Sequence, residues 1–446
     1  MKKVLILAYD FPPYVSVGGL RPFSWFNYLS ENGLYPVVVT RQWSNKHGNY
    51  LDYVSPGFSK EVVVEESNTG TILRSPYKPN LANRLLLKYG EKRFNFLRKL
   101  VTLYYELIQF LFFTGTKSKL FYAADSYLKK NKVDLIIATG TPHILFKYAS
   151  KLSSNYDIPW VADYRDPWSQ SRSRNTNWFL KKWNPFFEKK FLKNVSEITT
   201  VSPLFEEKIK ELIKDKKISI VTNGFDPEAM EKVKNIDQQS EKLKIAHVGT
   251  IYFYHPIEKF LSAVNSFYES KLNIDFEINF YGLSKENELT DLIEKKFPLL
   301  KKVVFVHPKL SNLDLLKVIS KHNILLLFNN YAKIGTKIYD YIALKRLVLF
   351  CFSEESVEKV TEYPYYIESD DHKYNPQIEL LLKTNSGLII KNSKDLVENL
   401  HKLHDEFKSK GEISCNSVNI DEFSRKNQAR ILADRMKSII STHQSK

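Results

Sequence analysis

Short runs of β-branched and aliphatic residues alternate along the chain with longer segments whose apolar positions recur at helical spacing. This alternation is typical of parallel strands joined by crossover helices, so the sequence predicts an α/β protein. The strands fall into two series. We expect the first series at residues 4–8, 36–40, 134–139, 159–163, 197–201 and 218–222, and the second at 244–248, 275–281, 303–307, 324–329, 348–352 and 387–390.

The two series predict two Rossmann-like domains, an N-terminal domain over residues 1–224 and a C-terminal domain over 243–420. Residues 225–242 are polar and contain few large apolar side chains, so they are expected to connect the domains. Residues 421–446 place apolar side chains at roughly helical spacing among basic ones, which predicts a C-terminal helix.

Charge is unevenly distributed in this chain of 446 residues with net charge +16. Residues 1–200 contain 29 basic and 15 acidic side chains, whereas residues 201–446 contain 37 and 35. The N-terminal half therefore favours an anionic partner: a membrane surface, a diphosphate or a nucleic acid. The sequence has no helix-turn-helix, zinc-binding or RNP-type motif, so we expect no nucleic-acid partner.

Residues 78–113 combine basic and apolar side chains. Between Lys78 and Lys99 there are seven basic residues and one acidic residue, and a mostly apolar stretch follows. This composition predicts a surface that lies in a membrane interface, and two ordinary domain helices with solvated cations are the alternative. The stretch is shorter than the roughly 20 residues that span a bilayer. We expect a cytoplasmic protein, peripheral on the inner face of the plasma membrane.

The segment YDFPPYVSVGGLRPF follows the first strand. Gly18 and Gly19 permit close backbone approach, and a helix is expected from Leu20 to Gly33. Exposed N–H groups at its start, with Arg21 beside them, would bind a phosphate; a simple strand-to-helix turn is the alternative. The chain lacks GxGxxG and an acidic residue after the second strand, which disfavours a nicotinamide oxidoreductase.

Polar residues also follow the fourth strand, in the segment IPWVADYRDPW. Asp163, Arg165 and Asp166 are expected at the carboxyl end of a parallel sheet, where ligands of open α/β sheets bind. A carboxylate beside an arginine acts as a base, as an acceptor for a sugar hydroxyl or as an orienting group. A purely structural Asp–Arg pair is the alternative.

The second series carries its own candidate residues. Gly249, Thr250 and His255 follow the strand at 244–248, although a lone loop histidine is often merely solvated. Lys337 and Asp340 are three residues apart and therefore share a helix face. A cation there would neutralise a leaving diphosphate, and a carboxylate would accept hydrogen bonds from two ribose hydroxyls. A surface salt bridge between the two side chains is the alternative.

Taken together, these motifs resemble a glycosyltransferase of the GT-B fold, in particular the retaining family 4 group that builds bacterial surface polysaccharides. The resemblance extends from residue 3 to the last helix. It rests on seven segments in the expected order: YDFPPYVSVGGLR, DLIIATGTPH, IPWVADYRDPW, ITTVSP, IVTNGFDP, IAHVGTIY and KIYDYIALKRLVLF.

The resemblance implies two Rossmann-like domains facing each other across a cleft, with the C-terminal helix crossing back to the first domain. It implies a nucleotide-sugar donor, a UDP- or GDP-sugar, held mainly by the C-terminal domain, and a glycan or lipid-linked acceptor held mainly by the N-terminal one. The resemblance further implies that the reaction is hexosyl transfer with retention. We expect no cofactor and no metal, because the DxD metal motif is absent.

The resemblance also assigns roles to residues. Gly18 and Gly19 correspond to the loop that faces the donor phosphates, and Asp340 to the carboxylate that binds the ribose. The remaining assignments are catalytic or acceptor groups at Asp163, Arg165, Asp166 and Lys337, and nucleotide-sugar contacts at Arg21, Gly249, Thr250, His255 and Lys337.

Some positions depart from the family pattern. Where the family has the two glutamates of its E-x7-E motif, this chain has Ala332 and Asp340. Where the family often has an arginine and a lysine that clamp the diphosphate, this chain has Thr250 and, approximately, His255. Lys337 and Arg21 are expected to supply the positive charge instead. Two alternatives stay open: a GT-B sugar-nucleotide epimerase, and a catalytically degenerate member that serves as an assembly partner.

Overall fold

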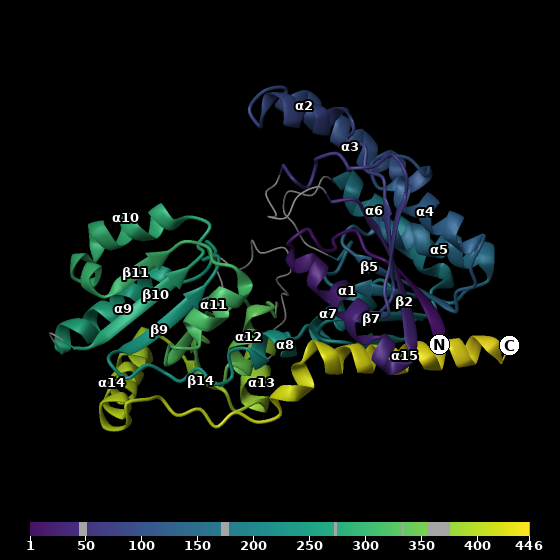
Figure 1. Ribbon diagram of the computed structural model, residues 1–446. Coiled ribbons are helices and arrows are strands. Elements are labelled where there is room, and N and C mark those ends of the chain that lie inside the picture. Colours follow the sequence, from purple (N-terminus) through teal and green to yellow (C-terminus); the bar gives the residue numbers. More distant parts are fainter. Residues whose placement is uncertain (44–50, 171–177, 272–273, 332–333, 355–374, 446) are drawn as a thin grey trace. The chain divides into compact units, whose positions relative to one another are not determined.

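A computed structural model describes residues 1–43, 51–170, 178–271, 274–331, 334–354 and 375–445. The chain forms two compact units (Figure 1). The N-terminal unit comprises Met1–Ser171, Asn175–Asn223 and Arg425–Lys446, and the C-terminal unit contains Gly224–Ser424. Each unit is built on its own mainly parallel sheet, so the predicted α/β class with two parallel-sheet domains is confirmed.

The sheet of the N-terminal unit has the strand order β3-β4-β2-β1-β5-β6-β7-β8, and β3 alone among these strands pairs antiparallel. Its central strands are buried on both faces because helices cover both sides, which explains their continuous apolar runs. The strands are β1 (Lys2–Leu7), β2 (Leu34–Arg41), β3 (Val63–Glu66), β4 (Thr71–Ser75), β5 (Leu135–Gly140), β6 (Trp160–Tyr164), β7 (Glu197–Thr200) and β8 (Ile218–Ile220).

Every strand predicted for the first series is present to within two residues at either end. Strands β3 and β4 were not predicted from the sequence. The side chains of β3 are half-buried or exposed, so its segment VVEE lacks the apolar run that marks a buried strand. The predicted Leu20–Gly33 helix was also misplaced: α1 begins at Val17, because Ser16 caps it by accepting from the Gly19 N–H, and ends at Tyr28.

Helices flank the sheet of the N-terminal unit. The last of them, α15, presents Leu432, Ala433 and Met436 to the core around Ile6 and Trp25, so the end of the chain completes this unit. The helices are α1 (Val17–Tyr28), α2 (Leu81–Tyr89), α3 (Asn95–Leu111), α4 (Ser118–Leu128), α5 (Ile144–Tyr156), α6 (Trp178–Phe191), α7 (Pro203–Lys210) and α15 (Arg425–Gln444).

The sheet of the C-terminal unit is parallel, with the order β11-β10-β9-β12-β13-β14, and every strand predicted for the second series is present. Its strands are β9 (Leu243–Val248), β10 (Phe276–Tyr281), β11 (Val304–His307), β12 (Ile324–Phe328), β13 (Leu347–Cys351) and β14 (Gly387–Ile390). Its helices are α8 (Pro227–Glu231), α9 (Ile257–Ser270), α10 (Glu286–Lys296), α11 (Asn312–Ile319), α12 (Lys337–Ala343), α13 (Pro376–Lys383) and α14 (Ser393–Lys410).

Residues 225–242, expected as an interdomain connection, lie in the C-terminal unit. Phe225, Met230 and Val233 are buried in its core, and α8 forms part of the segment. Spacing alone did not reveal this packing because three apolar side chains in a polar segment are a weak signal. The predicted C-terminal helix begins at Arg425 instead of residue 421, because a short 3-10 turn precedes it.

Both sheets contain a point at which the strand order reverses. In the N-terminal unit this point lies between β1 and β5, and in the C-terminal unit it lies between β9 and β12. Open α/β sheets bind ligands outside the carboxyl ends of the strands at such points. The segments that leave these four strands therefore define the candidate sites.

Candidate functional site

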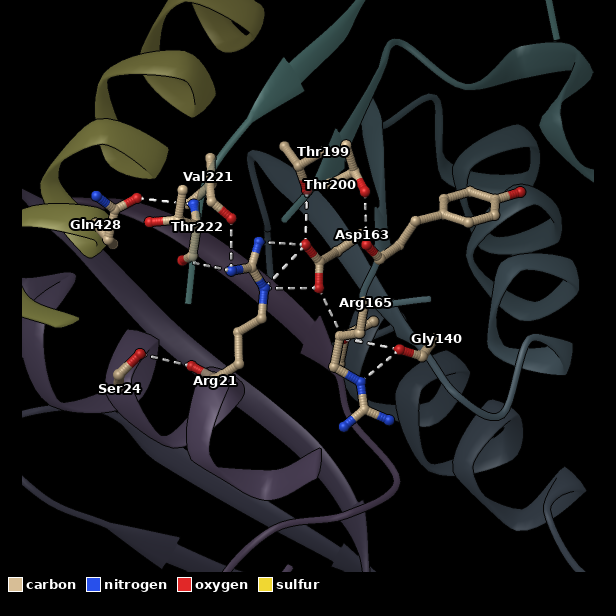
Figure 2. A network of polar contacts seen from close by, with 12 residues as sticks. Arg21, Ser24, Gly140, Asp163, Arg165, Thr199, Thr200, Val221, Thr222 and Gln428 are labelled. Atoms are coloured by element: carbon tan, nitrogen blue, oxygen red, sulfur yellow. Dashed lines mark hydrogen bonds and ion pairs between the residues drawn. The ribbon is translucent and has the colours of Figure 1, made fainter. Parts of the chain in front are cut away.

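Arg21 and Asp163 form a buried ion pair at the carboxyl edge of the N-terminal sheet (Figure 2). The Arg21 Nη2 donates to Asp163 Oδ1 at 2.7 Å, and its Nε lies 3.1 Å from both carboxylate oxygens. The hydroxyls of Thr139 and Thr199 donate to the same carboxylate, each at 2.8 Å. The Asp163 side chain has no solvent exposure. Both of its oxygens are therefore satisfied by protein groups.

The remaining Arg21 nitrogen is also engaged. Its Nη1 donates to the carbonyl oxygens of Val221 at 2.8 Å and Thr222 at 3.0 Å, and the Thr222 N–H donates in turn to Gln428 on α15. These contacts tie α1, β6, the end of β8 and α15 together. Asp163 was expected to pair with the nearby Arg165 if its role were structural, but its partner is Arg21. The geometry favours a structural role for Asp163, and it turns the Arg21 guanidinium away from the role of phosphate ligand.

Arg165 lies close to Asp163 in sequence but belongs to a different cluster. Its Nε donates to the Gly140 carbonyl at 2.7 Å and its Nη2 to the Thr141 carbonyl at 3.2 Å. In Figure 2 its guanidinium points away from the Arg21–Asp163 pair. A Cβ on Gly18 would collide with Arg165 Nη1, so any larger residue there would displace this guanidinium.

Asp10, which was not predicted as a site residue, lies in the same cluster. It follows β1, and its Oδ2 accepts from Ser16 Oγ at 2.6 Å and would lie 2.8 Å from a Cβ on Gly18. Burial raises the pKa of its carboxyl, while the charges of Arg165 and Arg41 oppose that shift. The available signal was its position, because an acidic residue directly after a central strand falls at the reversal point of the sheet.

Asp166 is in the loop after β6, which other residues hold in place. The Glu188 carboxylate is buried and accepts from the Tyr164 hydroxyl at 2.8 Å and the Ser169 N–H at 3.1 Å. His143 lies 3.5 Å from the Asp166 carbonyl, and burial lowers the pKa of its imidazole to about 4. His143 is therefore neutral at physiological pH. Hydrogen bonds to Glu188 and to the Gly140 carbonyl therefore fix the position of the loop that carries Arg165 and Asp166.

Lys337 is the central cation of the C-terminal candidate site. It is the first residue of α12, and its Nζ donates to the Val248 carbonyl at the end of β9 at 2.7 Å. Gly249 has a φ of 86°, and a Cβ there would collide with Lys337 Nζ, so both its conformation and its close approach require glycine. Burial lowers the pKa of Lys337 to about 8, and Asp340 partly opposes that shift.

His255 is buried, at 6% exposure, so the interpretation as a solvated loop histidine is wrong. Its Nδ1 accepts from the Tyr252 N–H at 3.2 Å, which leaves the proton on Nε2, 2.9 Å from Asn330 Oδ1. Burial lowers its pKa to about 4, so the ring is neutral and does not replace a cationic diphosphate clamp. It positions the segment that leaves β9, where Thr250 is half-buried.

His247, on β9, was not singled out from the sequence. Its Nδ1 lies 3.1 Å from the Leu326 carbonyl on β12, and burial lowers its pKa to about 3. A histidine inside the apolar run IAHVGT was the available signal. Lys337, Gly249, Thr250, His255 and Asp340 all lie near the reversal point of this sheet, whereas Ala332 lies outside the described residues.

The comparisons with known proteins concern the family and the fold of the chain. The model of Glycosyltransferase Family 4 matches residues 114–229. The whole chain is similar to sucrose-phosphate synthase from Thermosynechococcus elongatus, at 12% identity and a TM-score of 0.57, over 100% of this chain and 98% of that one. The chain has the GT-B fold of glycosyltransferases.

Two further GT-B structures show the same coverage, 100% of this chain and 98% of theirs. They are the α,α-trehalose 6-phosphate synthase from Burkholderia multivorans, at 8% identity and a TM-score of 0.58, and the E. coli trehalose-6-phosphate structure bound with UDP-2-fluoro glucose, at 9% and 0.55. A search of the curated proteins finds no match. The GT-B fold and the matched family together support a glycosyltransferase.

The GT-B chain also displays an apolar surface on α2 and α3. In Figure 1 these helices extend away from the sheet of their unit. Exposed apolar side chains of the surface include Phe96, Leu100, Leu103, Tyr104, Leu111 and Phe112.

Within the described residues, no helix is both long and apolar enough to span a membrane. No three acidic, histidine or cysteine side chains of these residues are grouped so as to hold a metal ion.

Proposed function

We propose that the protein transfers a hexosyl group, with retention, from a nucleotide sugar to a glycan or lipid-linked acceptor in bacterial polysaccharide or cell-envelope biosynthesis. The observation that carries this proposal is the half-buried Lys337 cation beside Gly249, at the strand-order reversal of the C-terminal sheet. A donor of the UDP-sugar class is supported by the similar E. coli structure bound with UDP-2-fluoro glucose; a GDP-sugar is the other donor class that we propose.

In the proposed reaction, the Lys337 ammonium stabilises the diphosphate as it leaves. Electrostatic stabilisation by a fixed, partly desolvated cation is worth more than the same charge in water. Asp340 lies one helical turn beyond Lys337 and accepts the ribose hydroxyls. The acceptor hydroxyl attacks from the face that the diphosphate leaves, so configuration is retained. Positioning and the Lys337 charge drive this step, with no metal ion assigned to it.

The first test is thermal stabilisation by UDP, GDP, CDP and ADP, with and without EDTA. We expect a shift with UDP or GDP that survives EDTA, because a ligand that binds only the native state stabilises it. Loss of the shift in EDTA would contradict metal independence. No shift with any nucleotide would contradict donor binding and favour a degenerate assembly partner.

Lys337→Ala tests the catalytic assignment. We expect it to lower turnover by at least about 100-fold, the effect of removing one preorganised charge-stabilising group. The matched control is Lys296→Ala, which removes an exposed lysine paired with Glu258 on the surface of the same unit. Equal turnover by the two variants would remove Lys337 from the mechanism. Epimerisation of the sugar within the nucleotide sugar, without transfer to an acceptor, would identify an epimerase instead.

We also propose that residues 78–113 hold the protein on the cytoplasmic face of the plasma membrane. The exposed residues of α3 recur at spacings of three and four, so Phe96, Leu100 and Leu103 share a helix face. The cations Arg93 and Lys99 are exposed beside them, and basic side chains next to an apolar face match an anionic lipid surface.

Sedimentation with liposomes that contain anionic lipid tests this contact. Phe96→Asp combined with Leu100→Asp is expected to abolish cosedimentation, because both side chains would be withdrawn from the acyl boundary. Phe58→Asp is the control, since Phe58 is exposed elsewhere on the same unit. Wild-type protein that stays in solution would refute the membrane contact and leave the glycosyltransferase proposal unaffected.

A further inference from the structure

Strands β9 and β12 separate before either of them ends. They are neighbours in the sheet of the C-terminal unit, but their pairing stops at Ala246 and Leu325. β9 continues to Val248, and β12 continues to Phe328. The separation coincides with the reversal point of the strand order, where open α/β sheets bind ligands.

The backbone of Val248 faces this separation. Successive residues of a strand direct their N–H and C=O groups toward opposite neighbouring strands. Gly249, the next residue, donates its N–H to the Tyr281 carbonyl on β10 at 2.8 Å. Val248 therefore directs both of its backbone groups toward β12, which no longer pairs with it at this point. Because Val248 is buried, these two groups need partners from another part of the unit.

Two side chains of α12 supply the partners. The Val248 N–H donates to the Tyr341 hydroxyl at 2.9 Å, and the Val248 carbonyl accepts from Lys337 Nζ at 2.7 Å. Lys337 and Tyr341 are four residues apart, so they share one face of the helix. On the β12 side, the Leu326 carbonyl lies 3.1 Å from His247 Nδ1. Three side chains thus take the place of hydrogen bonds between the two strands.

The Tyr341 hydroxyl is coupled to Lys337 through Val248. An ammonium has three N–H donors, and the Val248 carbonyl is the one hydrogen-bond partner of Lys337 within the described residues. The position of that carbonyl therefore sets where the other donors point. Tyr341 is buried, so removal of its hydroxyl leaves the Val248 N–H without an acceptor and away from water. A rotation of Val248 toward a new acceptor would withdraw its carbonyl from Lys337.

We propose that Tyr341 is a positioning residue of the donor site: its hydroxyl holds Val248, and the Val248 carbonyl directs the Lys337 ammonium toward an anionic ligand. The inference rests on the proposed function in one respect, because the anion is the diphosphate of the donor. Tyr341 itself does not touch the ligand. A tyrosine at a buried position of a helix has the pattern of an ordinary core residue, so the sequence gave no reason to select it.

Tyr341→Phe removes the hydroxyl and keeps the ring in the core. The matched control is Tyr281→Phe, because Tyr281 is also buried in this unit and its hydroxyl lies 3.4 Å from His322 Nε2, before the start of β12. The first measurement is hydrogen exchange by mass spectrometry, which needs no ligand. We expect residues 247–250 to exchange at least about tenfold faster in Tyr341→Phe than in the wild type or the control. Unchanged exchange in β13 shows that the variant is folded.

The second measurement is the affinity for UDP and GDP at pH 7 and pH 9, by isothermal titration calorimetry. Lys337 has a pKa of about 8, so its charge is mostly present at the lower pH and mostly lost at the higher one. The charge of Asp340 opposes this lowering of the pKa. His247 and His255 also face Lys337, and burial lowers their pKa values to about 3 and about 4, so both rings are neutral at either pH.

The expected results differ between the variants. The wild type and Tyr281→Phe should bind the nucleotide up to about tenfold more weakly at pH 9 than at pH 7, in proportion to the charged fraction of Lys337. Tyr341→Phe should bind at least about fivefold more weakly than the wild type at pH 7. Its affinity should change less than about threefold between the two pH values, because a displaced Lys337 contributes little in either protonation state.

The inference is overturned if exchange of residues 247–250 is unchanged in Tyr341→Phe, or if this variant binds both nucleotides as well as the wild type does. Equal weakening at both pH values also overturns it, because a general structural role would leave the pH dependence as it is in the wild type. If the wild type binds neither nucleotide, the proposed donor binding is refuted, and the exchange result still decides whether Tyr341 holds Val248.

Discussion

The Arg21–Asp163 pair permits a quantitative test of the N-terminal unit. Asp163 is fully buried and Arg21 is 6% exposed, so neither charge can be hydrated if its partner is removed. Breaking a buried ion pair by removing one partner costs about 3–5 kcal/mol. In Arg21→Met, the carboxylate keeps only the hydroxyls of Thr139 and Thr199, and two carbonyls lose their donor. We expect a destabilisation of about 4 kcal/mol.

The assay uses a feature of the sequence that separates the two units. All six tryptophans belong to the N-terminal unit, so tryptophan emission during thermal unfolding reports on that unit alone. For a unit of this size, about 4 kcal/mol corresponds to a Tm lower by roughly 8–16 °C. The tryptophans are Trp25, Trp43, Trp160, Trp168, Trp178 and Trp183.

A double-mutant cycle gives the refuting result. Asp163→Asn leaves a buried arginine without its counterion, and Arg21→Met with Asp163→Asn removes both charges. The double variant is expected to be at least about 1 kcal/mol more stable than the sum of the two single effects predicts. Two results would show that Arg21 and Asp163 are not a desolvated ion pair. One is a single variant that lowers the free energy of unfolding by less than about 1 kcal/mol, and the other is additive effects in the double variant.

Three further predictions concern the C-terminal unit. Gly249→Ala is expected to abolish nucleotide-induced thermal stabilisation, because the added Cβ would displace Lys337. The control is Gly335→Ala, which should bind the nucleotide normally because a Cβ there has open space. Equal nucleotide binding by the two variants would contradict the packing argument. Because Lys337 has a pKa of about 8, its charge is present below that pH and lost above it. The donor kcat/KM should therefore fall above about pH 8, and Lys337→Arg should move that fall upward in a pH-rate profile. Lys345→Gly should raise stability by about 0.5–1 kcal/mol in calorimetry, because Lys345 is exposed with a φ of 53°; a lower Tm would contradict this.

Local sequence patterns determined the elements of this fold. Parallel strands covered on both faces must be apolar throughout, so runs such as ILLLF on β12 marked the buried strands of both units. Strand β3 was not predicted because it is an edge strand whose side chains are largely exposed. The few apolar side chains of residues 225–242 were also insufficient to predict that this segment is buried, since their burial depends on a core formed by the rest of the C-terminal unit.

The candidate residues were recognisable as polar side chains after strands, but their partners were not. Arg21 and Asp163 were selected for separate roles, and only tertiary packing brings these residues, 142 positions apart, into one buried pair. Lys337 reaches a carbonyl 89 positions away, and the surrounding unit desolvates its ammonium, which lowers its pKa.

The sequence by itself determined which segments become strands and helices and which strand ends carry chemistry, because those properties follow from the spacing of neighbouring side chains. The tertiary structure decided which polar groups are satisfied and which remain available, as for Asp163 and Lys337. The physical reason is that desolvation and hydrogen bonding depend on groups distant in sequence, which no local pattern specifies.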